Sequence, residues 1–149
     1  MKIRTARSED LDAIKALLVE NGLPASDVTA DLLHDFAVAE GAHGAVVGSV
    51  GLERFGAEAL LRSLAVAKPE RSAGLGSKLL AHAEHMALTS GLSELWLLTT
   101  TAADFFRRAG YSAVDRPSAP AELQATTQFA ELCPSTAACM RKRFKTDSA

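Results

Sequence analysis

A glycine-containing turn in the middle of the chain has the residue types of an anion site. A mostly apolar run, Leu60–Ala67, ends just before Pro69, and Arg71, Gly74 and Gly76 follow with the spacing Arg-x-x-Gly-x-Gly. The pattern then becomes helical, which predicts a turn between a strand and a helix. The first N–H groups of a helix lack intrahelical acceptors and lie at the positive end of its dipole. Such a turn binds anions, most often phosphate.

Two other phosphate-binding turns do not fit these residues. A P-loop ends in Gly-Lys followed by Ser or Thr, whereas this chain has Gly76, Ser77 and Lys78 in that order. A dinucleotide-binding turn has a third glycine where this chain has Leu79, and it belongs to the first β-α unit of a fold instead of mid-chain.

Length and composition predict one globular domain. The chain has 149 residues, of which 48% are apolar, enough for a packed core. Its net charge is −2 with no block of like charge, so we expect no nucleic-acid partner. No apolar stretch reaches the roughly 18 residues that span a bilayer, so we expect no membrane partner. We expect one domain over residues 1–144 and a frayed tail over 145–149.

The compartment is expected to be the cytoplasm. The N-terminal residues Met1–Arg4 lead directly into a strand-like segment instead of an apolar signal region. The two cysteines are too few for a disulfide scaffold, which favours a reducing compartment.

The elements that would position the glycine turn follow from periodicity and capping residues. Ser8, Thr29 and Thr101 are expected to cap helices, and a helix is expected to follow the turn as far as Gly91. A further helix is expected over Ser118–Leu132. The expected strands are Lys2–Ala6, Phe36–Glu40, Ala45–Arg54, Glu58–Ala67, Glu94–Thr99, Tyr111–Asp115 and Ser135–Phe144.

With the glycine turn after the fourth strand, this order resembles the GNAT family of acyl-CoA N-acetyltransferases. Phe105–Tyr111, an aromatic pair followed by Gly-aromatic, resembles that family's helix-to-strand block. The resemblance covers nearly the whole chain. It implies a single-domain α/β (α+β) fold: a mixed central sheet of about seven strands with helices on both faces. Strands 4 and 5 of that fold are splayed, and acetyl-CoA is the co-substrate, with no metal.

Two narrower resemblances concern the acceptor. Leu97–Phe106 is similar to the GNAT domain of N-acetylglutamate synthases. Asp115–Pro120, Gln128-Phe129, Leu132–Pro134 and Cys139-Met140 resemble a GNAT group associated with arsenic-resistance operons. The first implies a glutamate-like acceptor; the second reports a gene setting and leaves a role in arsenic resistance open.

By resemblance, the end of the fourth strand and the glycine turn hold coenzyme A. A backbone N–H, that of Val66, would also stabilise the oxyanion that develops on the thioester carbonyl. Many members use a tyrosine to protonate the leaving thiolate, but the matching position is Phe106, and Tyr111 matches an ordinary core aromatic. The residues assigned to coenzyme A are Leu64, Ala65, Val66, Arg71, Ser72, Ala73, Gly74, Leu75, Gly76, Ser77 and Phe106.

Three side chains are candidates for the acceptor site. Glu53 is either the general base that deprotonates the amine or a solvated strand-end acid, and Glu58 is a weaker candidate for the base. Arg62 either clamps a substrate carboxylate or reaches solvent or an acid of the protein. Thr99 would line the site or serve as a cap.

Cys133 and Cys139 are expected to be structural, reduced thiols. Six residues of extended strand span about 20 Å, too far for both to ligate one ion. His82 and His85 lie one turn apart on the third predicted helix and are expected on its exposed side.

The sequence thus predicts an acetyl-CoA-dependent N-acetyltransferase acting on a small-molecule amine, most simply an amino acid or a glutamate-like compound. A protein or peptide acceptor and a non-catalytic acyl-CoA sensor remain as alternatives. A homodimer is left open.

Overall fold

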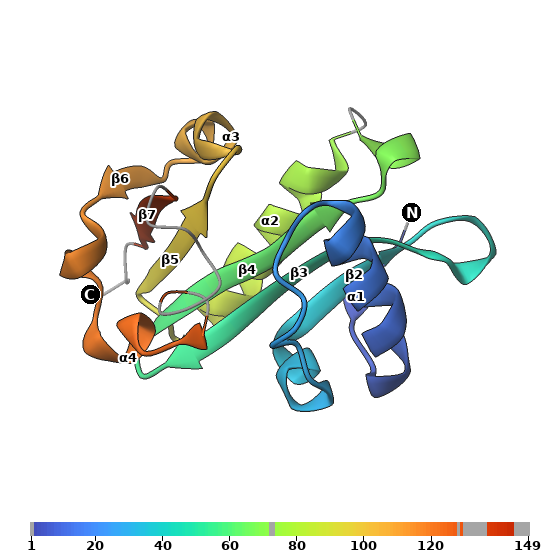
Figure 1. Cartoon of the computed structure of the whole chain (residues 1–149), viewed down its shortest axis with the longest axis horizontal. Helices are drawn as coiled ribbons and strands as arrows, with labels where there is room; N and C mark the ends of the chain where they lie inside the picture. The colour runs from blue at the N-terminus through green and yellow to red at the C-terminus, as the bar shows by residue number, and fades with distance from the viewer. Residues whose placement is uncertain (1, 72–73, 128, 130–136, 145–149) are drawn as a thin grey trace. The chain divides into compact units, whose positions relative to one another are not determined.

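A computed structural model describes residues 2–71, 74–127, 129 and 137–144. These residues contain a seven-stranded sheet in the order β1-β2-β3-β4-β5-β7-β6 (Figure 1). β1 and β2 are antiparallel, as are β2 and β3, β5 and β7, and β6 and β7, whereas β4 and β5 are parallel. The strands are β1 (Lys2–Thr5), β2 (Phe36–Glu40), β3 (Val46–Phe55), β4 (Glu58–Val66), β5 (Glu94–Thr99), β6 (Ser112–Val114) and β7 (Ala138–Arg143).

The helices follow the predicted order, and the mixed sheet with helices confirms the expected fold class. The parallel ladder of β4 and β5 contains the pairs from Glu58–Glu94 to Leu60–Trp96, whereas β4 itself continues to Val66. The α-helices are α1 (Leu11–Glu20), α2 (Leu75–Thr89), α3 (Ala103–Arg108) and α4 (Ala121–Gln124), and the 3-10 turns are η1 (Ser8–Asp10), η2 (Ala30–Asp35), η3 (Ala42–Gly44), η4 (Lys68–Glu70) and η5 (Arg116–Ser118).

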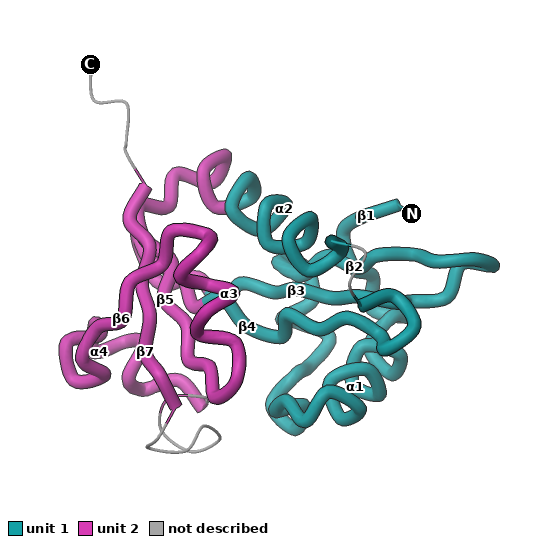
Figure 2. The backbone as a smooth tube through the Cα atoms, turned by 90° about the horizontal axis from the view of Figure 1, so that it is seen from above, with its two compact units in different colours: residues 1–53, 61–86 teal, residues 54–60, 87–149 magenta. Residues whose placement is uncertain are grey.

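The described residues form two compact units (Figure 2). Unit 1 contains residues 1–53 and 61–86, and its α1 and α2 lie on opposite sides of its strands. On the α1 side, Ile14 and Leu18 pack with Phe36 of β2 and Ala65 of β4. On the α2 side, Gly48 of β3 allows close approach, since a Cβ there would lie 2.8 Å from a Leu79 methyl carbon.

Unit 2 contains residues 54–60 and 87–149. Its core joins β4, β5, α4 and β7 through Leu60, Trp96, Leu123 and Cys139, all at most 4% exposed. Each unit therefore has apolar packing of its own.

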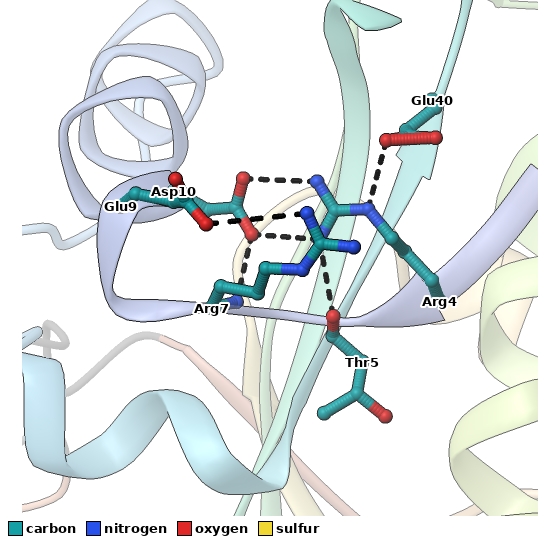
Figure 3. Close-up of polar contacts among 6 residues, drawn as sticks. All are labelled: Arg4, Thr5, Arg7, Glu9, Asp10 and Glu40. Atoms are coloured by element: carbon teal, nitrogen blue, oxygen red, sulfur yellow. Dashed lines mark hydrogen bonds and ion pairs between the residues drawn. The ribbon is translucent and has the colours of Figure 1, made fainter.

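β1 is attached to its neighbours by an arginine with two acidic partners (Figure 3). The guanidinium of Arg4 donates two hydrogen bonds to the carboxylate of Asp10, at 2.8 and 3.0 Å, and one to Glu40 Oε1 at 2.9 Å. The hydrogen bonds to Asp10 and then to Glu40 raise the pKa of Arg4. We call these three residues the Arg4 cluster; it joins β1 to η1 and to the end of β2.

Three predicted caps are wrong in detail. Ser8 lies inside η1 instead of capping it; Asp10 accepts the N–H of Arg7 at 2.7 Å, and α1 begins only at Leu11. Thr29 holds the predicted N-cap position, but without a side-chain cap hydrogen bond and before the 3-10 turn η2 instead of an α-helix, because Phe36 already belongs to β2 and only six residues remain between them. The cap predicted at Thr101 is also displaced, since the N-cap residue of α3 is Ala102.

The helix predicted over Ser118–Leu132 is also wrong in extent. Of its residues that the structure describes, Ala121–Gln124 form α4 after Pro120, Ala125 and Thr126 interrupt the helix, and Thr127 and Phe129 are helical again. At the interruption the Thr126 hydroxyl donates to the Leu123 carbonyl at 2.7 Å and accepts the N–H of Phe129 at 3.3 Å, which competes with helical bonding. Residues 128, 130–136 and 145–149, which include Cys133, lie outside the described residues.

Candidate functional site

The predicted glycine turn enters α2 as the residue pattern requires. Gly74 has φ +78°, a left-handed conformation that glycine adopts without strain, and no atom lies within 4 Å of a Cβ built there. α2 begins at Leu75, and Lys78 donates the first N–H of the helix to the Gly74 carbonyl at 3.2 Å. The N–H groups of Leu75, Gly76 and Ser77 precede that bond, the usual position of anion-binding amides. Ser72 and Ala73 lie outside the described residues.

Arg71 connects this turn to two other elements. Its Nε donates to the Val66 carbonyl at 3.2 Å, and its Nη2 donates to Asn21 Oδ1 at 2.6 Å. Its own amide donates to the Lys68 carbonyl at 3.2 Å, so this amide is engaged within η4. The turn is thereby held against the end of β4 and the C-terminal end of α1.

The C-terminal end of β4 is hydrogen-bonded to β3 along one of its two edges. Ala67 donates its N–H to the Val47 carbonyl at 2.8 Å. Successive N–H groups of a strand point to opposite edges, so the Val66 N–H points away from β3. Leu64, Ala65 and Val66 are the last residues of β4 before the glycine turn, and their contacts with coenzyme A stay a prediction.

β4 has a backbone irregularity just before these residues. Ser63 has φ +59°, which costs a non-glycine residue about 1–3 kcal/mol and persists where neighbours fix it. Ser49 of β3, fully buried, donates its hydroxyl to the Ser63 carbonyl at 2.7 Å, and Arg62 Nε donates to Ser63 Oγ at 3.1 Å. Sequence reasoning missed both serines; the one available signal for Ser49 is a polar residue between the glycines and valines of β3.

Arg62 and Glu53 are brought together by the structure, with a third residue that the sequence did not indicate. The Arg62 side chain is fully buried and donates to Asp27 Oδ2 at 2.5 Å and Oδ1 at 2.7 Å. It also donates to Glu53 Oε1. We call Asp27, Glu53 and Arg62 the Arg62 cluster. Asp27 lies in the loop between α1 and η2, 35 residues from Arg62, and no spacing rule relates the two.

The charges of the Arg62 cluster depend on this pairing. Burial by itself lowers the pKa of Arg62, but the hydrogen bonds to Asp27 and then to Glu53 raise it, and the net direction is upward. Of the two alternatives for Arg62, contact with acids of the protein is the one present in the structure. Direct contact with a substrate carboxylate stays a prediction, as does the role of Glu53 as base.

Thr99 and Phe106 belong to unit 2. Thr99 Oγ1 accepts the N–H of Ala102 at 3.0 Å, and Ala102 takes the N-cap position of α3 that had been predicted for Thr101. Phe106 is 6% exposed and packs edge-on against Phe105 and Tyr111, with ring centroids 5.1 and 5.5 Å apart. Tyr111 is thus a core aromatic, as expected.

The remaining polar candidates have simple surroundings. Cys139 of β7 is buried, and burial raises the pKa of its thiol. Burial and then the neighbouring His85 lower the pKa of His82, which is half-buried on α2. Among the residues that the structure describes, no three His, Cys, Asp or Glu side chains gather as metal ligands would. Over the same residues, no helix has the length and apolarity to cross a membrane.

A sequence profile of the acetyltransferase (GNAT) domain matches residues 33–113, more than half of the chain. The chain therefore belongs to the GNAT acetyltransferase family. The matched segment contains β2, β3, β4, the glycine turn and α3, which are the elements described above.

Several solved structures share the fold. N-acetylglutamate synthase from Neisseria gonorrhoeae, in complex with coenzyme A and N-acetyl-glutamate, matches with 24% identity and a TM-score of 0.83 over 97% of this chain. This chain spans 35% of the length of that one. Rv2747 from Mycobacterium tuberculosis, in complex with coenzyme A and a second ligand, matches with 21% identity and a TM-score of 0.83 over 97% of this chain and 100% of its own.

A third structure extends the comparison. PaiA N-acetyltransferase from Thermoplasma acidophilum, in complex with coenzyme A, matches with 17% identity and a TM-score of 0.70 over 96% of this chain and 98% of its own. At such identities the likeness concerns the fold. The fold predicted from the glycine turn and Phe105–Tyr111 is thereby confirmed.

Proposed function

We propose that this chain is an N-acetyltransferase that moves an acetyl group from acetyl-CoA to the amine of a small molecule. An amino acid or a glutamate-like compound is the first acceptor to test. The observation that carries the proposal is the glycine turn at the start of α2, held by Arg71 against the end of β4, in a chain of the GNAT family. Coenzyme A in three structures of the same fold supports it.

The donor would be held by backbone groups on both sides of the turn. Leu64, Ala65 and Val66 would contact the pantetheine arm and the acetyl carbonyl, and the N–H groups of Gly74–Ser77 would bind the pyrophosphate. The left-handed conformation of Gly74 fits this role, since a Cβ built there would meet no atom of the described residues within 4 Å. Acetyl-CoA supplies an activated acyl group that an amine can attack directly.

The Val66 N–H would stabilise the oxyanion that forms during this attack. It points away from β3, and the peptide that follows it, between Val66 and Ala67, is held at both ends: its carbonyl accepts from Arg71 and its N–H donates to the Val47 carbonyl. Removing one such donor typically costs about 3–4 kcal/mol of transition-state stabilisation. A preorganised backbone donor is consistent with a reaction that needs no covalent enzyme intermediate.

Glu53 would accept the proton of the amine. An alkylammonium has a pKa of about 10.4, so about one molecule in a thousand is neutral at pH 7. Glu53 Oε1 accepts from Arg62, so proton transfer would use Oε2, directly or through a water molecule. Phe106 stands where many family members have a tyrosine acid, so a water molecule or the proton of the amine would serve the leaving thiolate.

Thiol release from acetyl-CoA, measured across a panel of amino acids and simple amines, tests the proposal. We expect turnover with at least one amino acid, and a fall in kcat of about 100-fold in Glu53→Gln with an unchanged KM for acetyl-CoA. Glu20→Gln, which removes an exposed acid at the end of α1, serves as the matched control. Tight acetyl-CoA binding without turnover of any amine would favour the non-catalytic sensor.

Two parts of the sequence prediction are not supported beyond resemblance. A role in arsenic resistance depends on the C-terminal motifs, and a protein or peptide acceptor is the alternative within the same chemistry. Acetylation of a peptide N-terminus with no turnover of free amino acids would select that alternative.

A further inference from the structure

Arg62 already holds a carboxylate in the geometry that a carboxylate ligand would adopt. The two oxygens of Asp27 accept from two different nitrogens of the guanidinium, at 2.5 and 2.7 Å. Paired, parallel bonds of this kind are the strongest and most specific contacts that Arg makes with a carboxylate. Asp27 comes from a loop, whereas Arg62 and Glu53 come from adjacent strands, so Asp27 is the partner that can be exchanged most easily.

A second carboxylate cannot simply be added to this arrangement. One guanidinium and two carboxylates give the Arg62 cluster a net charge of −1, and four hydrogen bonds from Arg62 already have acceptors in Asp27, Glu53 and Ser63. The Arg62 side chain is 0% exposed, and each further buried negative charge would be costly. An exchange of one carboxylate for another leaves the charge and the number of hydrogen bonds unchanged.

The nitrogen that Asp27 shares with Glu53 connects this exchange to the acceptor. Nη1 of Arg62 donates both to Asp27 Oδ2 and to Glu53 Oε1. A carboxylate in the place of Asp27 is therefore adjacent to the proposed base. An α-amino acid, which carries its amine one carbon from its carboxylate, has the two groups that this arrangement requires.

We propose that Asp27 occupies the position on Arg62 that the α-carboxylate of the acceptor takes, so that an α-amino acid binds by displacing Asp27. The inference rests on the proposed function and adds a specificity-determining residue to it. Asp27 acts as an internal competitor: it keeps the buried guanidinium paired in the free protein and sets the KM for carboxylate-bearing acceptors.

Replacement of Asp27 tests the competition. Asp27→Asn weakens the internal partner, so the KM for glutamate should fall about tenfold because a larger fraction of the protein is competent to bind it. The KM for acetyl-CoA and the KM for glutamate diamide, which lacks both carboxylates, should not change. Asp31→Asn removes the same charge from an exposed position and should leave all three values unchanged. An unchanged or higher KM for glutamate in Asp27→Asn would overturn the inference.

A stability measurement decides the inference independently of turnover. Asp27→Ser should leave Arg62 with one acid and lower the melting temperature, and millimolar glutamate should restore it while the diamide does not. If the variant fails to fold, glutamate should recover folded protein during refolding. Equal effects of glutamate and the diamide would contradict the exchange. Absence of turnover in the wild type with every amine would instead refute the proposed function, and the stability result would still stand.

Discussion

The Arg4 cluster and the Arg62 cluster have the same composition and different surroundings. Each contains one arginine, one aspartate that accepts two hydrogen bonds from this arginine and one glutamate that accepts one from it. The clear difference lies in the arginines, since the Arg4 side chain is 12% exposed and that of Arg62 is fully buried. The acids are alike in exposure: Asp10 and Glu40 are 9% and 25% exposed, and Asp27 and Glu53 are 11% and 15% exposed. Arg4 joins β1 to elements next to it (Figure 3), whereas Arg62 joins a loop to two strands of the sheet.

The burial of the arginine decides how strongly each cluster depends on complete pairing of its charges. A charge that water reaches is cheaper to leave unpaired than a fully buried one, which carries a large desolvation penalty that only complete pairing offsets. Apolar residues of similar volume often stabilise a core as well as a buried ion pair does. We therefore interpret the Arg4 cluster as structural, and the Arg62 cluster as a group whose charges have a use in binding.

The largest expected difference is in stability after loss of the arginine. Arg62→Met removes a fully buried cation from two carboxylates that are only 11% and 15% exposed, so we expect a loss of about 3–5 kcal/mol in the free energy of unfolding. Arg4→Met should cost less, since Arg4 is itself partly exposed and water reaches Glu40, although Asp10 is buried. Urea unfolding at neutral pH measures both. Equal losses in the two variants would show that burial does not distinguish the clusters, and the double variant Arg62→Met with Asp27→Asn should recover part of the loss.

The next difference concerns the two serines around Arg62, Ser49 and Ser63. Ser49→Ala leaves the buried Ser63 carbonyl without its donor, so we expect a cost of about 1–3 kcal/mol in the free energy of unfolding. Ser63→Gly removes the conformational strain at φ +59° but also the acceptor for Arg62 Nε, so its net effect should be smaller. Thermal unfolding of both variants measures this order.

If Ser49 also positions the residues that follow it in the sheet, Ser49→Ala should raise the KM for acetyl-CoA, and Ser49→Thr, which keeps the hydroxyl, should restore it. If Ser49→Ala lowers the stability as expected but leaves the KM for acetyl-CoA unchanged, the role of Ser49 is structural alone.

The sequence predicted the fold because local signals and long-range packing agree. The glycine turn, the apolar strand Glu94–Thr99 and the helix after Gly74 depend on periodicity and on φ, which neighbouring residues determine. The caps at Ser8 and Thr101 failed because the helices begin at other residues: Ser8 already lies inside η1 after the N-cap Arg7, and Ala102 is the N-cap of α3. Local propensity does not fix the first residue of a helix to within one or two positions.

The candidate site could be predicted only in part. Arg62 and Glu53 were found because strand parity and charge are visible in a sequence. Asp27 was missed because its place is set by how a loop crosses the sheet, and Ser63 because a positive φ in a serine has no sequence signature. The structure therefore adds to the candidate site those residues that are distant in the sequence and meet only in the folded chain.

The smallest expected effect is the pH dependence of the Arg4 cluster. The hydrogen bonds from Arg4 hold the pKa of Asp10 below its usual range, so the folded protein binds the Asp10 proton less readily than the unfolded chain does. This contribution to stability is fully present above the unfolded pKa, about 3.9, and is lost as the pH falls through the lower pKa of the folded state. Urea unfolding between pH 5 and pH 2.5 should show a decline in stability that is shallower in Asp10→Asn. Because Asp31 is exposed, Asp31→Asn should retain the wild-type slope; identical slopes in all three proteins would show that Asp10 does not contribute to acid unfolding.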